Sequence, residues 1–524
     1  MTHSLLNKLS RKRKLVAGSM FVAVLLSHSS AFGHARLVHS RPEANSGLKE
    51  SPKIVELWFS EELESTVSTI IVTDQNGKHV DKNNVTLAEG NKKLQIDLEE
   101  LGSGTYTVEW KALSTDQHTM KGKFTFNVAL AENVVNTSTP THPSSAETTK
   151  QAEPKGSASP QASESTEESG STWMMSVVRW LQYLAMMSLV GGFAFTLLVL
   201  GPALRADVGS VSVAGKSDAM ALSLRRILFL SWWSVALLML TTFVSLVQQA
   251  SAVFDRTIQE SLSPSVLGQV LTKTGYGGAW FLQAGGAFAL VIIIFLLGRT
   301  QKRSPAKEPG ALWWTALLVG VVLLVAPSWT GHAAAAKKEF RLAVVSDWLH
   351  LVAGAFWVGG LFHLALTIGP VLRGFDKRER LGMLHRIVRL FTRVAIPTVI
   401  LLVLAGLYNT WAHVESFGAL WSTVYGRTLL LKLVLVTLML ALGALHNFHF
   451  GKKAARLSGS EEGEIGSGDR SKLEQGFSRS IIVEAVLGIA VLLITAILVF
   501  QAPARSHPAM TSSGAAPTLV QDRR

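Results

Sequence analysis

Polar and apolar residues alternate with a period of two in the first quarter of the chain, between residues 34 and 130. Alternation of this kind predicts β-strands with one buried face. Turn-forming sequences such as Gln75-Asn76-Gly77 separate the alternating stretches. The pattern therefore predicts an all-β domain, a small Greek-key sandwich or barrel. Its expected strands are 53–60, 68–73, 93–98, 104–113 and 122–129.

Long apolar runs replace this alternation after residue 171, and eight of them are long enough to cross a bilayer. The expected segments are 174–201, 224–248, 278–297, 311–327, 344–372, 391–412, 427–450 and 481–500. Arginine and lysine concentrate in the loops after the first, third, fifth and seventh segments, although Lys337, Lys338 and Arg341 form an outer group. Because positively charged loops stay in the cytoplasm, we expect an all-α bundle of eight transmembrane helices with both ends outside.

The start of the chain has the order of a secretory signal peptide. A basic cluster at residues 11–14 precedes an apolar run at 15–26, which is too short to span a bilayer. The small residues Ala31 and Gly33 then form a cleavage site. Cleavage after Gly33 makes His34 the first residue of the mature protein, and cleavage after Ala31 is the alternative.

Residues 131–171 are rich in serine, threonine, proline, alanine and glutamate and contain no aromatic residue. Such a segment has too few apolar side chains to offset the entropy of ordering, so it predicts a disordered linker. The expected parts of the chain are a signal peptide at 1–33, an exported β domain at 34–130, this linker, a membrane domain at 172–502 and a flexible tail at 503–524.

The composition restricts the chemistry. The chain contains no cysteine, which excludes disulfides and thiolate metal sites, so binding of a soft metal needs histidine or methionine. The formal net charge of +13 does not indicate a nucleic-acid partner. Five of the positive charges lie in the signal peptide, and most of the others lie in loops between membrane segments, where topology accounts for them.

Three residues of the exported domain form a candidate metal site. A free α-amine at His34, once deprotonated, chelates a metal together with the Nδ1 atom of the same residue. Asp116 and His118 are two residues apart, so they point to the same side of an extended backbone. Three nitrogens and one carboxylate oxygen in a plane suit Cu(II). Each feature alone is common at surfaces without metal, so the prediction depends on their combination.

Several stretches resemble known copper proteins. The exported domain resembles the CopC family of copper-binding proteins in HARLVHSRPEANSGL, from residue 34, and in LSTDQHTMKGKFTFNV, from residue 113. This resemblance implies that His34, Asp116 and His118 hold Cu(II). The membrane half resembles the CopD family in SWTGHA (328–333), SDWLHLVAGAFWVGGL (346–361) and VYGRTLLLK (424–432). The whole is similar to the fused CopC–CopD copper proteins of bacteria, of the YcnJ type. Because the exported domain has a single methionine, Met120, we expect no second, thioether Cu(I) site in it.

Ionisable residues inside a bilayer are costly and indicate function by default. We expect an outer group at His332, Asp347, His350 and His413, and an inner group at His363, His446 and His449. Together they form a candidate copper path, with histidines that only hydrogen-bond between helices as the alternative. On a regular helix, His350 and His363 point about 220° apart, so both cannot line one straight pore. We expect Gly354, Gly359 and Gly360 to allow close helix approach, and the methionines of the first segment to pack rather than bind Cu(I).

These patterns predict a copper-handling protein of the bacterial cell membrane, with its copper domain outside and no enzymatic activity. It captures Cu(II) and passes copper across the membrane; the resemblance implies import. The expected partners are copper ions, the lipid bilayer and a copper chaperone or another exported copper protein. One alternative is a haem-binding electron-transfer protein or cupric reductase with His363 and His446 as axial ligands. Another is a copper sensor, resistance or delivery protein without transport.

Overall fold

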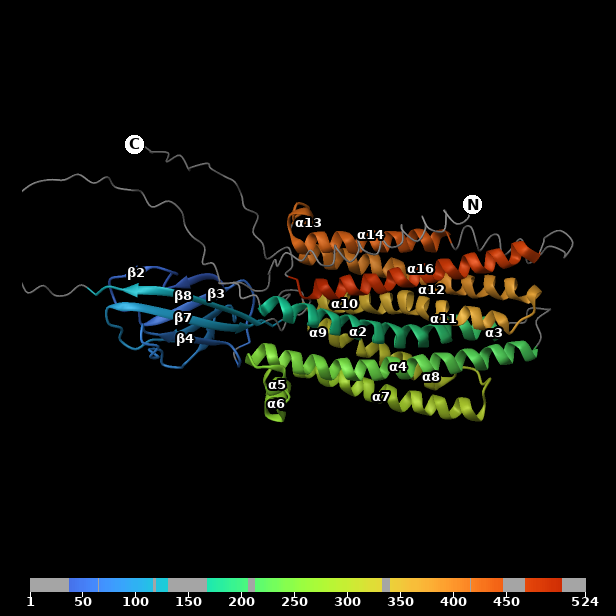
Figure 1. Cartoon of the computed structure of the whole chain (residues 1–524), viewed down its shortest axis with the longest axis horizontal. Coiled ribbons are helices and arrows are strands. Elements are labelled where there is room, and N and C mark those ends of the chain that lie inside the picture. The colour runs from blue at the N-terminus through green and yellow to red at the C-terminus, as the bar shows by residue number, and fades with distance from the viewer. Residues whose placement is uncertain are drawn as a thin grey trace, which may run out of the picture.

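The computed structural model describes residues 37–64, 66–115, 119–130, 167–205, 213–331, 340–414, 416–445 and 467–501. A β-sandwich and a bundle of long helices lie end to end along the longest axis of the molecule (Figure 1). This arrangement confirms the expected fold class, an all-β domain followed by an all-α membrane domain.

Two four-stranded sheets form the sandwich, in the orders β1-β3-β6-β5 and β2-β8-β7-β4. The strands are β1 Leu37–Arg41, β2 Gly47–Leu48, β3 Ile54–Phe59, β4 Thr69–Thr73, β5 Thr86–Ala88, β6 Lys93–Asp97, β7 Gly104–Leu113 and β8 Thr119–Val128. All neighbouring strands are antiparallel except β2 and β8, which are parallel. The five predicted strands are present, and the alternation did not reveal β1, β2 and β5.

The core of the sandwich comes from the buried face of each strand. Val55, Leu57 and Phe59 alternate along β3 and are each at most 3% exposed. The ring of Phe59 packs edge-on against Trp110 of β7, with the ring centroids 5.1 Å apart. A Cβ atom at Gly122 of β8 would overlap the Trp110 indole, so this glycine lets the indole lie across the neighbouring strand. These contacts pack the end of the sandwich where β7 leads to β8.

Eight helical spans make up the described part of the bundle, as the apolar runs predict. They are formed by α2 Glu167–Phe195 with η1 Thr196–Leu200 and α3 Gly201–Arg205; α4 Val213–Phe254; α7 Tyr276–Arg303; α8 Ala311–Leu323 with α9 Val325–Trp329; α10 Phe340–Gly354 with η3 Ala355–Gly359 and α11 Gly360–Arg373; α12 Lys377–His413; α14 Val424–Leu445; and α16 Ser467–Val499. Shorter helices are α5 Ile258–Ser261, α6 Pro264–Lys273 and α13 Ala419–Ser422.

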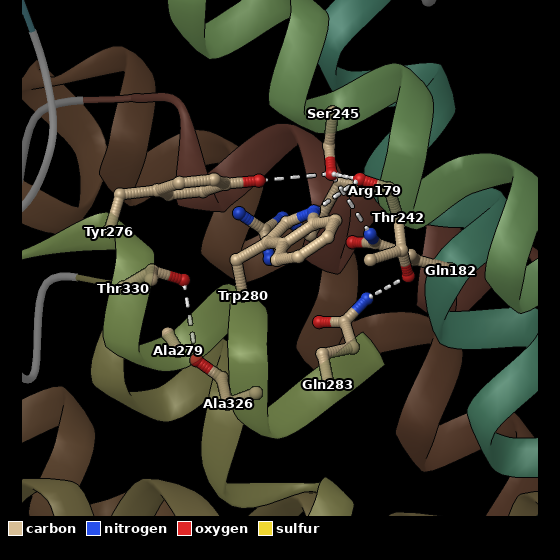
Figure 2. A pocket seen from close by; sticks show the side chains of 10 residues that line it. All are labelled: Arg179, Gln182, Thr242, Ser245, Tyr276, Ala279, Trp280, Gln283, Ala326 and Thr330. Carbon is tan, nitrogen blue, oxygen red and sulfur yellow. Dashed lines mark hydrogen bonds between the residues drawn. The ribbon is translucent and has the colours of Figure 1, made fainter. Parts of the chain in front are cut away.

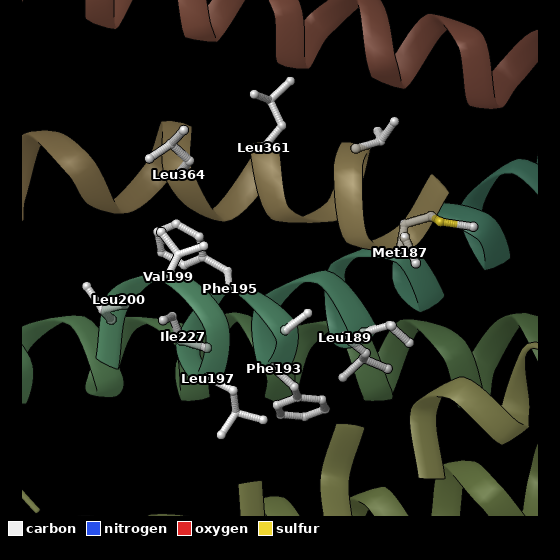
Figure 3. Close-up of a cluster of buried hydrophobic side chains, with 14 of the residues drawn as sticks. Met187, Leu189, Phe193, Phe195, Leu197, Val199, Leu200, Ile227, Leu361 and Leu364 are labelled. Carbon is white, nitrogen blue, oxygen red and sulfur yellow. The ribbon is translucent and has the colours of Figure 1, made fainter. Parts of the chain in front are cut away.

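Helix α2 lies at the centre of the bundle and is the most deeply buried span. Its apolar side chains pack against Ile227 of α4 and against Leu361 and Leu364 of α11 (Figure 3). Met186 and Met187 of α2 are each 1% exposed. Both thioethers therefore lie within the packed interior of the bundle.

Glycines bring α2 very close to the helix pair α10 and α11. A Cβ atom at Gly191 would overlap the backbone of Gly359, and one at Gly359 would overlap the carbonyl group of Met187. At Gly360, an added Cβ would lie 3.1 Å from Phe391 of α12. The expected close approach is confirmed at Gly359 and Gly360, whereas an added Cβ at Gly354 would meet only ordinary contacts at 4.0 Å. The closest approach, at Gly359, coincides with the π-helical turn η3.

The sandwich lies at the end of the bundle where α2 begins, α4 ends and α7 begins (Figure 1). The opposite end carries Arg205 of α3, which pairs with Glu308 at 3.3 Å. It also carries the basic last turn of α7, with Lys302 and Arg303. The β domain and these basic helix ends are thus at opposite ends of the bundle.

Candidate functional site

The three predicted metal ligands of the exported domain, His34, Asp116 and His118, lie outside the described residues. The structure does describe the residues that flank them. Leu37 begins β1, three residues after His34, while Thr115 and Thr119 border the segment that contains Asp116 and His118.

These flanking residues meet at one end of the sandwich. Leu37 pairs with Phe59 at the end of β3. Four residues after Phe59, Leu63 forms an isolated bridge with Ser114, and the backbone N–H of Glu64 donates to Leu113 O at 2.7 Å. Residues far apart in sequence therefore bring the start of β1 and the β7–β8 connection to the same end of the fold.

Asp347 and His350 both lie on α10 and face α12. Asn409 of α12 donates to Asp347 Oδ1 at 3.5 Å and accepts a hydrogen bond from Ser346 at 2.9 Å. His350 Nδ1 lies 3.1 Å from the carbonyl oxygen of Leu402. Both predicted residues are therefore hydrogen-bonded between helices.

Lys432 of α14 is a neighbour that the sequence interpretation missed. Its ammonium group lies within electrostatic range of Asp347 and of His350. The signal was present in the sequence, because a lysine within the apolar run LLLKLVL is costly in a bilayer unless it is paired. The ammonium attracts the Asp347 carboxylate, so the surroundings of Asp347 already contain a cation.

His363 of α11 is buried in the bundle core, with 1% of its surface exposed. Its Nε2 atom lies 2.8 Å from the carbonyl oxygen of Ser188 on α2 and 3.4 Å from the Ser188 hydroxyl. Ser234 of α4 in turn donates to that hydroxyl at 2.9 Å. A Cβ atom at Gly192 would lie 2.6 Å from Nε2, so the imidazole lies directly against the α2 backbone. Sequence patterns did not reveal these partners.

His350 and His363 contact different helices, α12 and α2 respectively. The angle of about 220° expected between them assumes a regular α-helix. That assumption is wrong, because the π-helical turn Ala355–Gly359 lies between them and holds more residues per turn. The conclusion that the two histidines do not share one helix face agrees with their contacts.

The other predicted membrane ligands lie at the edge of the described residues or beyond it. His332, His446 and His449 lie outside the described residues, and His413 is described only as the last residue of α12. Within the described ranges, no three His, Asp or Glu side chains lie close enough together to hold a metal ion. The outer and inner groups therefore stay predictions.

A small polar hollow lies between α2, α4, α7 and α9 (Figure 2), at the end of the bundle that faces the sandwich (Figure 1). Tyr276 and Gln182 both hydrogen-bond Ser245, at 3.1 Å and 3.3 Å, and Gln283 donates to Thr242 at 2.7 Å. Arg179 is the charged residue that lines this hollow. Hydroxyl and amide groups beside a guanidinium are a poor ligand set for a copper cation.

Family models for copper proteins match three parts of the chain. The CopC domain matches residues 37–129, the copper resistance protein D-like N-terminal domain matches 169–339, and copper resistance protein D matches 385–498. The chain therefore joins a CopC domain to CopD-type domains, and with its eight apolar spans it is a multi-pass membrane protein of copper handling.

Several individual proteins are similar to this chain. Over 92% of its length the chain is 28% identical to the copper transport protein CutJ of Bacillus subtilis, of which the match covers 76%. Protein YobA of Escherichia coli is 32% identical to this chain, in a match that covers 23% of this chain and 98% of YobA. The crystal structure of CopC from Methylosinus trichosporium is 36% identical, in a match that covers 19% of this chain and 99% of the CopC chain with a TM-score of 0.18.

Proposed function

We propose that this protein captures Cu(II) on its β-sandwich through His34, Asp116 and His118, and passes copper inward across the membrane through its helical bundle. The mature chain then begins at His34, after removal of residues 1–33, and the linker, membrane domain and tail have the boundaries expected from the sequence. The protein acts as a carrier without catalysing a reaction, and a copper chaperone or another exported copper protein is its exchange partner.

The observation that carries this proposal is the meeting of two distant segments at one end of the sandwich. The bridge between Leu63 and Ser114 and the pair Leu37–Phe59 bring the start of β1 near the β7–β8 connection. A terminal amine, its own imidazole and two side chains two residues apart provide the nitrogen and oxygen donors that Cu(II) prefers. Both chain segments that carry these donors leave the same end of the fold.

Two features of the bundle support its part in copper movement. His363 presents a buried ring nitrogen in the core, at the crossing of α2 with α11. The basic helix ends at Arg205 and Lys302 lie opposite the sandwich. Because positively charged helix ends stay in the cytoplasm, this arrangement supports a sandwich outside the cell. The name of the relative CutJ, a copper transport protein, supports transport rather than storage.

The copper site is tested by titrating the purified processed protein, without residues 1–33, with Cu(II). We expect His34→Ala or Asp116→Ala to weaken Cu(II) binding by about a hundredfold or more, because each removes ligands from a four-donor plane. His79→Ala is the matched control, since His79 is an exposed histidine of the same domain, 3.5 Å from Asp81. Sequencing of the processed protein should begin at His34; any other first residue would contradict the chelate.

Cellular copper content separates transport from its alternatives. Cells that express the protein should hold more copper than matched cells without it, whereas a sensor or delivery protein would leave the content unchanged. A Soret band in the purified protein would favour the haem-binding alternative, in which His363 and His446 are the axial ligands.

A further inference from the structure

Three polar contacts between described residues join the sandwich to the bundle. Lys121 of β8 forms an ion pair with Asp255, the residue after α4. Glu64 accepts a hydrogen bond from the backbone N–H of Gly275 at 3.0 Å. Thr66 donates to the carbonyl oxygen of Lys273 at 2.9 Å. The three bundle partners all belong to residues 255–275, the segment that joins α4 to α7 and contains α5 and α6.

This segment, the docking platform, is a folded part of the bundle. Thr257 and Glu260 form a reciprocal cap at the start of α5. In α6, Val266 and Val270 are buried against Leu246 of α4 and Tyr276 of α7. The platform therefore holds its contact groups in defined positions beside the ends of α4 and α7.

The sandwich contributes its contacts from one end. Glu64 and Thr66 follow Leu63, which bridges to Ser114. Lys121 is the cross-strand partner of Lys111, close to the β7–β8 connection. β1 begins at this same end. The sandwich therefore turns towards the bundle the end that carries Leu37, Ser114 and Thr119, the described residues close to the predicted ligands.

The contacts suit a reversible association. The side chains of Lys121 and Asp255 are 40% and 66% exposed, and exposed ion pairs are weak and are screened by salt. The sandwich and the bundle belong to one chain, however, and covalent attachment raises their effective concentration. The charges are also complementary, because Lys111 and Lys121 of the sandwich both attract Asp255 of the bundle.

We propose that residues 255–275 dock the sandwich with its β7–β8 end towards the bundle, and that copper leaves the sandwich for the bundle in this docked state. The docking stands on the described contacts alone, and the copper step rests on the proposed function. The partner surface is thus a second domain of the same chain, held by one ion pair and two hydrogen bonds to backbone groups.

Cross-linking in liposomes tests the docking. Because the chain has no cysteine, Lys121→Cys with Asp255→Cys creates a unique thiol pair in the full-length protein. Lys78→Cys with Asp255→Cys is the control, since Lys78 follows β4 at the opposite end of the sandwich. With a short dimaleimide and no copper present, we expect the first pair to react about tenfold faster or more. Equal rates would overturn the docking.

The ion pair is tested with a zero-length carbodiimide, which joins an amine only to a carboxylate in contact with it. The wild-type chain should form the Lys121–Asp255 link, less of it in high salt. The charge-swapped chain, with Lys121→Asp and Asp255→Lys, should form the reversed link. A link in neither chain would overturn the assigned contact.

Copper movement through the locked chain tests the delivery step. The Lys121→Cys, Asp255→Cys chain is either cross-linked or capped with a monofunctional maleimide, so that both forms lack free thiols. We expect copper entry into liposomes to differ by less than about twofold between the two forms, because docking is already favoured by attachment. Loss of entry in the cross-linked form, with Cu(II) binding retained, would overturn delivery from the docked state. Absence of Cu(II) binding in both forms would instead contradict the proposed function, while the cross-linking rates still decide the docking.

Discussion

The imidazole Nε2 atom of His363 lies 2.8 Å from the carbonyl oxygen of Ser188, on the neighbouring helix α2. A carbonyl oxygen only accepts hydrogen bonds, so Nε2 carries the proton and Nδ1 of the neutral ring carries the lone pair. Among the described residues Nδ1 has no hydrogen-bond partner. The backbone of α2 thus orients an imidazole that keeps one nitrogen donor inside the bundle core.

Replacement of His363 tests whether this nitrogen carries copper. His363→Gln retains an N–H donor for Ser188 O but lacks the ring nitrogen, so we expect the fold to persist and copper uptake to fall by about tenfold or more. His363→Leu also loses the hydrogen bond and should cost about 1 kcal/mol of stability. Copper content per amount of membrane-inserted protein is the measurement. Uptake unchanged in His363→Gln would exclude Nδ1 as a ligand.

The close crossing of α2 and η3 predicts a strong effect of one methyl group. Gly191→Ala places a Cβ atom onto the backbone of Gly359, and overpacking of this kind costs about 1–3 kcal/mol. Gly285→Ala in α7 is the matched control, because an added Cβ there meets open space. We expect a lower Tm in detergent for Gly191→Ala and an equal or higher Tm for the control. Equal Tm values for both would mean that the helices do not cross this closely.

The electrostatic pairing of Asp347 with Lys432 predicts non-additive substitutions. Asp347→Asn and Lys432→Met each leave one partly buried charge without the opposite charge that attracts it, whereas the double variant removes both. In a double-mutant cycle measured by thermal unfolding, we expect a coupling energy of about 0.5–3 kcal/mol. If the effects of the two substitutions add within experimental error, Asp347 and Lys432 do not interact.

Lys111 gives the sandwich a pH-dependent group. Burial, and then the neighbouring charge of Lys121, lower the pKa of Lys111 to about 8. In the unfolded chain a lysine titrates near about 10.4. Between these values the unfolded state binds more protons than the folded state, so the free energy of unfolding rises as pH increases from about 8 to about 10.

Amine labelling followed by mass spectrometry measures this shift. The labelling rate of Lys111 in the folded chain should reach half its maximum near pH 8. In the denatured chain the same lysine should reach half its maximum near the usual lysine pKa of about 10.4. Lys121→Gln removes a like charge and should move the folded midpoint upward. A midpoint that does not change in this variant would assign the shift to burial alone.

The sequence predicted some elements better than others, for reasons visible in the contacts. Strand β7 has the predicted ends Gly104 and Leu113, because buried and more exposed residues alternate from Thr105 to Ala112. Strand β2 has only two residues and exists through its pairing with β8, so no local pattern marks it. The π-helical turn η3 also has no local pattern, and it changed the expected relationship between His350 and His363.

Local patterns alone determined the division of this protein into a sheet domain and eight membrane spans, since period and run length follow from which faces must be buried. They also selected the candidate ligands by residue type and spacing. Only the tertiary structure decided what surrounds those residues: Ser188 beside His363, Lys432 beside Asp347, and Gly275 beside Glu64. Each of these partners lies at least 85 residues away along the chain, and packing between separate elements brings them together, which no periodicity within one segment encodes.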